Sequence, residues 1–170
     1  NPWYKGQDLI LKTAQLLKRF TQLDFEWRVY GIQNIRFYES KYKIKAKEVN
    51  VRIMGTASKD ELVDALCDAT CYVHPSYIDN SLCEAQLLGV PVLATHVGGI
   101  SSLVIDGETG LLFPANAPYT LASLIKKLSQ ENALCMQLSQ KTRERALARH
   151  NPDAIRVRII DIYRQILNIK

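Results

Sequence analysis

The feature that most constrains the fold is a regular alternation of short apolar runs with segments of helical length. A run at 26–31 and another at 50–55 are rich in β-formers and end at glycine, and helical spacing of apolar residues marks 9–20. Further strand-like runs lie at 69–74, 91–95 and 111–113. Parallel βαβ units require this alternation. The sequence therefore predicts an α/β fold with a five-stranded, doubly wound parallel sheet.

Helix signals agree with this order. Ser58 and Glu61 form a capping-box pattern that predicts a helix through Cys67. From about residue 117 onward the pattern predicts three helices that close the domain. A length of 170 residues suits one domain, so we expect a single unit over 1–170.

Composition limits the partners. The net charge of +5 favours anionic small molecules or an acidic membrane surface, and the absence of a nucleic-acid motif argues against nucleic acid. The four cysteines lack zinc-site spacing, so we expect buried free thiols. No signal peptide or membrane-spanning run is found, which predicts a cytoplasmic protein. The first residue is not Met, which suggests a piece of a longer protein.

Several stretches resemble the group 1 family of retaining glycosyltransferases. They lie at 74–79, 84–95, 97–99 and 106–112, and residues 1–6 resemble the first βα loop of that family's donor domain. The resemblance implies the GT-B architecture, in which two Rossmann-like domains face each other across a cleft. It identifies this chain as the C-terminal, nucleotide-sugar-binding domain, one half of the enzyme, with the acceptor-binding N-terminal domain absent.

The resemblance implies a set of phosphate-binding residues. Lys5 would contact the donor diphosphate and assist catalysis, because negative charge grows there as the glycosidic bond breaks. The alternative is an ordinary solvated lysine. A helix opening near Leu82, with Ser81 beside it, would direct backbone amides at the same phosphates.

Three further positions would bind the rest of the donor. Glu84 would accept hydrogen bonds from both ribose hydroxyls, unless it only completes a capping box with Ser81. Asp79 would act at the sugar hydroxyls as a catalytic residue, unless it only forms an Asx turn. Gly98 and Gly99 would let the backbone approach the ligand, unless they form a plain turn.

The sequence departs from the family pattern in three places, one of which is that the first acidic residue after Pro-Ser is Asp79 rather than Glu. Asp79 and Glu84 are five positions apart, three fewer than in the family, which predicts a break in the chain beside Ser81 where a disordered loop is missing. The alternative is a true deletion. Ser101 and Ser102 stand where the family commonly has Glu.

The function implied is transfer of a sugar, of hexosyl type, from a nucleoside diphosphate to an alcohol acceptor with retention. The acceptor would be a saccharide or lipid-linked saccharide, and the full enzyme could associate peripherally with a membrane. No Asp-x-Asp pair is present, so we expect no metal and no other cofactor. Without its partner domain, the chain should bind donor weakly and turn over little.

Two alternatives stay open. One is a nucleotide-sugar epimerase of the same architecture. The other is a non-catalytic α/β domain of the receiver type, although the strand ends at Tyr30 and Met54 offer no phosphorylatable Asp.

Overall fold

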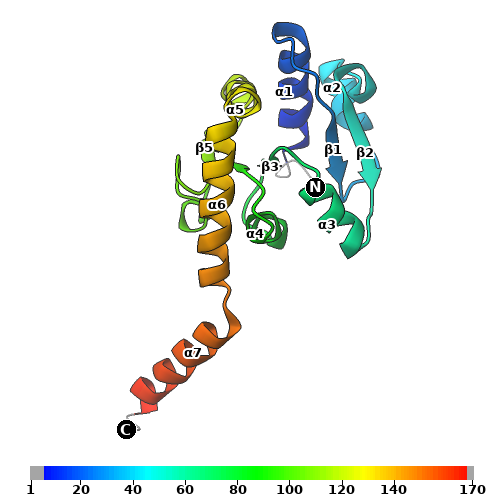
Figure 1. Cartoon of the computed structure of the whole chain (residues 1–170). Coiled ribbons are helices and arrows are strands. Elements are labelled where there is room, and N and C mark those ends of the chain that lie inside the picture. The colour runs from blue at the N-terminus through cyan, green and yellow to red at the C-terminus, as the bar shows by residue number, and fades with distance from the viewer. Residues whose placement is uncertain (1–5, 168–170) are drawn as a thin grey trace.

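Five parallel strands and the helices between them make up the computed structural model, which describes residues 6–167 (Figure 1). The elements run in the order α1 (Gln7–Phe20), β1 (Trp27–Tyr30), α2 (Arg36–Tyr42), the 3-10 helix η2 (Ala46–Val49), β2 (Val51–Gly55), α3 (Lys59–Cys67), β3 (Tyr72–His74), α4 (Asn80–Leu87), β4 (Val92–Thr95), the 3-10 helix η3 (Ile100–Ser102), β5 (Leu111–Phe113), α5 (Pro118–Gln130), α6 (Asn132–Arg149) and α7 (Pro152–Leu167). The α/β alternation predicted from the sequence is confirmed.

The strands form two parallel sheets rather than one. β1 pairs with β2, starting at Trp27 beside Val51, and β3 pairs with β4, which pairs with β5. Within the described residues, no pairing joins β1 to β3. Figure 1 shows the group around β1 and β2 set apart from the group around β3 to β5. The doubly wound layout is therefore present, but the predicted continuous ladder is interrupted between β1 and β3.

Local sequence signals explain why the helices begin where they do. The capping box of α3 is formed as predicted: the Glu61 amide donates to Ser58 Oγ at 3.3 Å, and the Ser58 amide donates to the Glu61 carboxylate at 2.7 Å. Pro118 opens α5, where its missing N–H costs nothing.

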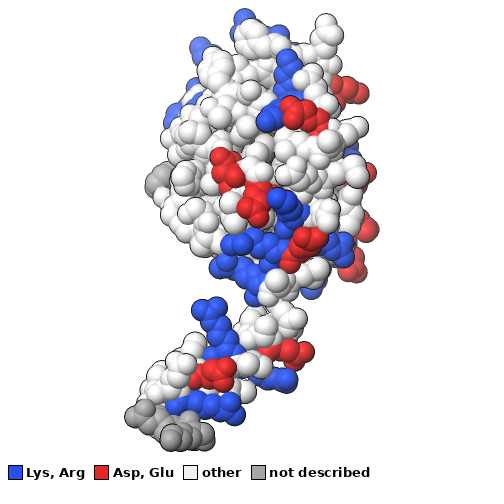
Figure 2. Space-filling model, turned by 60° about the vertical axis from the view of Figure 1, so that its left-hand side comes forward, with Lys and Arg blue, Asp and Glu red and all other residues white. Residues whose placement is uncertain are grey.

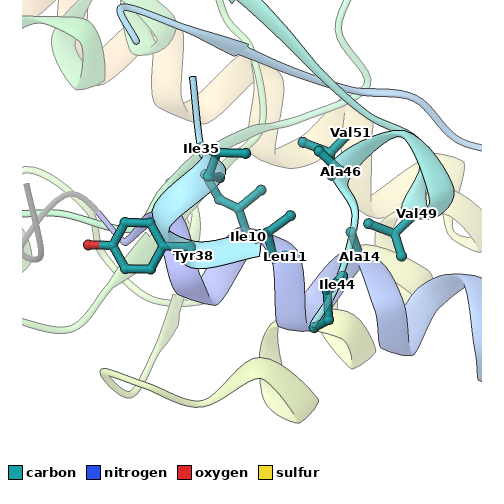
Figure 3. Packing of buried hydrophobic residues seen from close by; sticks show 9 residues of the cluster. All are labelled: Ile10, Leu11, Ala14, Ile35, Tyr38, Ile44, Ala46, Val49 and Val51. Atoms are coloured by element: carbon teal, nitrogen blue, oxygen red, sulfur yellow. The ribbon is translucent and has the colours of Figure 1, made fainter. Parts of the chain in front are cut away.

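Three clusters of buried apolar side chains hold these layers together. One lies between α1, α2 and the β1–β2 sheet, and Figure 3 shows Ile10, Leu11 and Ala14 of α1 facing residues of the neighbouring segments. The second joins α4 to β4 and η3, and the third joins β4 and β5 to α5 and α6. α1 also packs against α5, so helices link the two sheets.

The last helix, α7, projects away from the body (Figure 1), and all of its residues are exposed. On the face in Figure 2, basic and acidic side chains are interspersed, with basic ones gathered where the body adjoins α7. Among residues 6–167, no helix combines the length and apolar character that crossing a membrane requires.

The cysteines are free, as predicted, but the expectation that they are buried is wrong: Cys71, Cys83 and Cys135 are half-buried. Cys67 is exposed at the end of α3, whereas burial raises the pKa of the Cys71 thiol to about 12. Cys67 is exposed because α3 buries none of its side chains in the described structure.

Candidate functional site

The candidate site lies at the carboxyl end of β3, where ligands bind in doubly wound folds. β3 ends at His74, a short loop follows, and α4 begins at Asn80. Asp79 is the N-cap of α4, and its Oδ1 accepts a hydrogen bond from the Ser81 amide at 3.1 Å. The helix thus opens two residues earlier than the predicted start near Leu82, because the Asp79 side chain supplies the cap.

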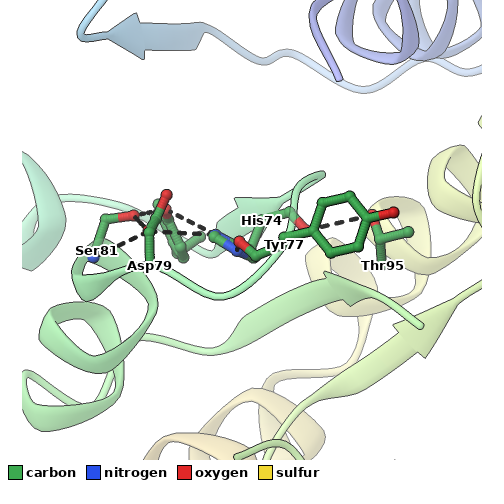
Figure 4. Close-up of polar contacts among 6 residues, drawn as sticks. His74, Tyr77, Asp79, Ser81 and Thr95 are labelled. Carbon is green, nitrogen blue, oxygen red and sulfur yellow. Dashed lines mark hydrogen bonds and ion pairs between the residues drawn. The ribbon is translucent and has the colours of Figure 1, made fainter. Parts of the chain in front are cut away.

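A partly buried polar network fixes this loop (Figure 4). His74 is 1% exposed, and its Nε2 lies 2.7 Å from the Tyr77 carbonyl oxygen, which can only accept. The Ser81 hydroxyl donates to Asp79 Oδ1, and Tyr72 lies 2.6 Å from that hydroxyl. Since the Ser81 proton goes to Asp79, Tyr72 donates to Ser81. The network therefore runs from β3 through Ser81 to the cap of α4.

Tyr72 was not identified from the sequence. Its hydroxyl also lies 3.3 Å from His74 Nδ1, and burial raises its pKa to about 12, so it remains a neutral donor. The signal that could have revealed it is the two-residue spacing to His74, which places both side chains on the same face of the strand.

The capping role for Glu84 is wrong. A capping box with Ser81 would need Ser81 at the N-cap, but that position belongs to Asp79. The Glu84 side chain is exposed and makes no hydrogen bond or ion pair with any residue from 6 to 167. An exposed carboxylate without a structural partner is available to a ligand.

The Asx-turn alternative for Asp79 is observed, since its side chain bonds an amide two residues on. This geometry occupies one carboxylate oxygen. Contact with a sugar hydroxyl remains a prediction for Asp79.

A groove of about 1040 Å³ runs past these residues. At the carboxyl ends of the strands it is lined by Tyr30 and Thr56 on one side and by Asp79, Ser81 and Glu84 on the other. Leu82, Gly98 and Gly99 do not line it. The Leu82 side chain is fully buried in the core beneath α4, so only its backbone amide could serve a ligand.

The glycine loop after β4 packs on the loop before α4. Gly99 has φ 81°, and a Cβ at this position would lie 2.8 Å from the Ile78 side chain. Gly98 is exposed, and a Cβ there would meet nothing within 4 Å. The backbone at Gly99 therefore lies too close to Ile78 for a larger residue. This contact is within the protein and does not involve a ligand.

The start of α1 touches the same loop. Gly6 has φ 67°, and a Cβ on it would lie 2.5 Å from the Pro75 side chain and carbonyl oxygen. Lys5, the predicted diphosphate ligand, lies outside the described residues, so its role stays a prediction.

The predicted chain break beside Ser81 is wrong. The backbone runs without interruption from Asp79 into α4, and Ser81 belongs to the first turn of that helix. The shorter loop is thus a property of this chain. Along a helix, five residues span about 7.5 Å, and both Asp79 and Glu84 still line the same end of the groove.

Comparison with known proteins shows which family the chain resembles. Residues 2–145 match the family model for glycosyl transferases group 1. The chain is 30% identical over 136 residues to a D-inositol 3-phosphate glycosyltransferase of Arthrobacter, covering 76% of this chain and 32% of that protein. It is 26% identical over 143 residues to an uncharacterized glycosyltransferase of Methanocaldococcus jannaschii, covering 82% and 39%.

Solved structures share the fold. Sucrose-phosphate synthase from Thermosynechococcus elongatus superimposes with a TM-score of 0.76 at 26% identity, over 99% of this chain and 44% of that one. Anabaena HepE, solved in complex with UDP-glucose, gives a TM-score of 0.77 at 19% identity, over 97% and 46%. The C-terminal domain of LpcC from Francisella tularensis gives 0.71 at 19% identity, over 88% and 80%.

The chain spans well under half the length of these curated relatives, and the architecture it matches is the C-terminal Rossmann-like domain of GT-B enzymes. The match to the family model extends over most of the described elements, from α1 into α6. This chain therefore belongs to the group 1 glycosyltransferases.

Proposed function

We propose that this domain binds a nucleoside-diphosphate sugar, and that the whole protein transfers the sugar to an alcohol acceptor with retention and without a metal. The observation that carries the proposal is the exposed Glu84 carboxylate, which bonds to no residue from 6 to 167. It lies on the helix whose N-terminus opens onto the same end of the groove. These two features offer binding groups for the two polar parts of a nucleoside diphosphate.

The N-terminus of α4 suits the diphosphate. The first amides of a helix have no intrahelical partner, and Asp79 accepts a hydrogen bond from that of Ser81. The amides of Asn80 and Leu82 would therefore be available to phosphate oxygens, together with the ammonium of Lys5. Donors fixed in this way stabilise the diphosphate as negative charge grows on the leaving group.

Glu84 suits the ribose. A carboxylate presents two acceptor oxygens to the two vicinal hydroxyls, and no residue from 6 to 167 competes for them. Asp79 would then lie near the sugar, and the Gly98–Gly99 loop would border it. These residues would bind and orient the donor. The N-terminal domain of the whole enzyme would bind the acceptor.

The relatives support the chemical class of both substrates. HepE was solved with UDP-glucose, and Staphylococcus aureus TarM with UDP and alpha-GlcNAc-glycerol. We extend this to a hexosyl donor and to a saccharide or lipid-linked saccharide acceptor, the latter placing the full enzyme peripherally at a membrane. Independence of metal rests on the lack of an Asp-x-Asp pair in the sequence.

Calorimetric titration of the intact protein with UDP-, GDP- and ADP-glucose tests the proposal. We expect one of these to bind more tightly than the other two, while free glucose does not compete. Product analysis with an acceptor should show a retained linkage rather than an epimerised donor, and the rate should not change with EDTA. If none of the three nucleotide sugars binds, the proposal is wrong.

A further inference from the structure

The His74 ring lies buried at the end of β3, within reach of the polar groups that hold the start of α4. Its Nε2 lies 2.7 Å from the Tyr77 carbonyl oxygen. Its Nδ1 lies 3.3 Å from the Tyr72 hydroxyl and 4.0 Å from Asp79 Oδ1 (Figure 4). Both ring nitrogens therefore have polar neighbours.

The contacts of this network determine how many protons it needs. The Tyr77 carbonyl oxygen can only accept, so Nε2 carries a proton. Three further contacts run in series: from Nδ1 to the Tyr72 hydroxyl, from that hydroxyl to Ser81, and from Ser81 to the Asp79 carboxylate. Each contact needs one proton, but the two hydroxyls supply only two. Since an ionised carboxylate can only accept, the third proton belongs to Nδ1, and the ring is an imidazolium.

Asp79 is the counter-ion of this imidazolium. It caps α4 and accepts a hydrogen bond from the Ser81 amide, and the N-terminus of a helix favours an ionised carboxylate. The 4.0 Å from its Oδ1 to Nδ1 lies in the range where opposite charges stabilise each other. Burial opposes a charged ring, but a nearby counter-ion and a hydrogen bond from each nitrogen are the conditions under which proteins hold buried charges.

Positive charge is useful at this position. The groove is lined at this end by the carboxylates of Asp79 and Glu84. Within residues 6–167, the only Lys or Arg that lines the groove is Arg28, which is already bound in two ion pairs. A diphosphate at the N-terminus of α4 would face both carboxylates. An imidazolium at His74 would offset the charge of Asp79 and let the anion approach.

We propose that His74 is a positioning residue for the donor, acting as an imidazolium that neutralises the Asp79 carboxylate. The charged ring also directs the Tyr72 hydroxyl at Ser81, which ties the first turn of α4 to β3. When the ring loses its second proton, Nδ1 becomes an acceptor and takes the Tyr72 proton, so Ser81 loses that bond. The effect on the donor rests on the proposed function, whereas the charge of the ring does not.

The titratable groups around the network change charge in other pH ranges. Asp79 and Glu84 belong to α4, and carboxylic acids ordinarily titrate about two pH units below histidine. Burial raises the pKa of Tyr72 to about 12, and it also raises the pKa of the Cys83 thiol. Two neighbours carry no charge, Gln7 of α1 and Thr95 of β4. A change in binding in the range where histidines titrate would therefore report on His74.

Nitrogen-15 NMR of the histidine rings in the intact protein tests the charge. The signals of His74 and of the exposed His96 are assigned with a glutamine variant at each position. We expect His74 to keep both ring protons to a pH at least about one unit above that at which His96 loses one. Tyr72→Phe removes the acceptor of the Nδ1 proton and should bring the two values closer together. If His74 becomes neutral together with His96, the proposal is wrong.

Calorimetry with UDP-glucose tests the effect on the donor, because the diphosphate of this probe keeps its charge in the range where histidines titrate. Affinity should fall about two- to tenfold as the His74 ring loses its second proton, the effect of losing one hydrogen bond. His96→Gln should keep this pH profile, whereas His74→Gln, which is neutral at every pH, should bind weakly throughout with a flat profile.

Two binding results would contradict the proposal in different ways. If His74→Gln keeps the pH profile of the wild type, His74 does not position the donor, although the donor binds. If UDP-, GDP- and ADP-glucose all fail to bind at any pH, the proposed function fails and the positioning role fails with it. The NMR result then still shows whether the ring is charged, so the two failures are distinguished.

Discussion

The Tyr72 hydroxyl lies 2.6 Å from the Ser81 hydroxyl, and this contact ties the sheet directly to the first turn of α4. Ser81 in turn donates to the Asp79 carboxylate that caps the helix. The orientation of α4, and with it the position of Glu84, therefore depends on a hydrogen bond that begins in β3.

Removing this hydroxyl should loosen the loop without unfolding the domain. In Tyr72→Phe, Ser81 keeps its bond to Asp79, while the contacts of the Tyr72 hydroxyl with Ser81 and with His74 Nδ1 are lost. We expect a loss of about 0.5–1.5 kcal/mol in unfolding free energy, measured by urea denaturation. Tyr163→Phe on exposed α7 is the matched control and should be neutral. Equal effects at both positions would show that the network does not stabilise the loop.

The same residue predicts a pH dependence. Burial raises the pKa of Tyr72 in the folded state to about 12 from an ordinary value near 10. Its contribution is complete below pH 10 and is lost as the pH rises toward 12. At pH 11 the wild type should have lost about 1.4 kcal/mol relative to Tyr72→Phe. If the difference in unfolding free energy between the two proteins is the same at pH 9 and at pH 11, this prediction is wrong.

Glu84→Gln tests ribose binding. The side chain has no structural partner among residues 6–167, so stability should change little. Gln presents one neutral acceptor where Glu presents two charged ones, and loss of a charged hydrogen bond costs about 1.5–3 kcal/mol. Calorimetry should therefore show about tenfold or greater weakening for the ribonucleotide.

The controls for Glu84 are a ligand and a second variant. The 2′,3′-dideoxy nucleotide should bind wild type and Glu84→Gln alike. Glu108→Gln, an exposed change in the turn before β5, should leave ribonucleotide affinity unchanged. If the ribonucleotide binds wild type and Glu84→Gln equally, the ribose lies elsewhere.

Lys5→Ala should weaken binding of the nucleoside diphosphate but not binding of the bare nucleoside. If Lys5 contacts the diphosphate, its loss removes one charge-assisted bond of about 1.5–3 kcal/mol. The nucleoside diphosphate should then bind about ten- to a hundredfold more weakly, whereas the bare nucleoside is unaffected. Equal weakening of both ligands would mean that Lys5 acts on the fold instead.

Gly6→Ala should be much more destabilising than Gly31→Ala. Both glycines have positive φ, 67° and 79°, so each substitution carries a backbone cost of about 1–2 kcal/mol. Only Gly6 adds a collision with Pro75, since a Cβ at Gly31 meets nothing within 4 Å. The difference in melting temperature between the two variants measures the contact. Similar values would show that α1 moves away freely from the loop.

Local features of the fold could be predicted well from the sequence. The capping box at Ser58 and Glu61 set the start of α3, and the apolar runs marked all five strands. Which strands pair with each other could not be predicted in the same way. The apolar pattern of a strand indicates how it is buried but does not indicate which strand lies beside it. The prediction of one continuous sheet was therefore wrong, since no described pairing joins β1 to β3.

The site was predicted less completely. The spacing from Asp79 to Glu84 was interpreted as a broken loop, but a side-chain cap lets α4 begin directly at Asn80. Tyr72 was missed because its role arises from the distance between two elements. Sequence spacing within either element does not reveal that distance.

The division between the sheets also has a mechanical consequence. A backbone ladder resists sliding, because its hydrogen bonds break when the register shifts, whereas packed side chains can exchange partners at lower cost. In this chain the β1–β2 half and the β3–β5 half are joined through α1 and α5 instead of through a described ladder. A relative displacement of the two halves would therefore disturb the packing of α1 against α5 rather than break hydrogen bonds of a described ladder.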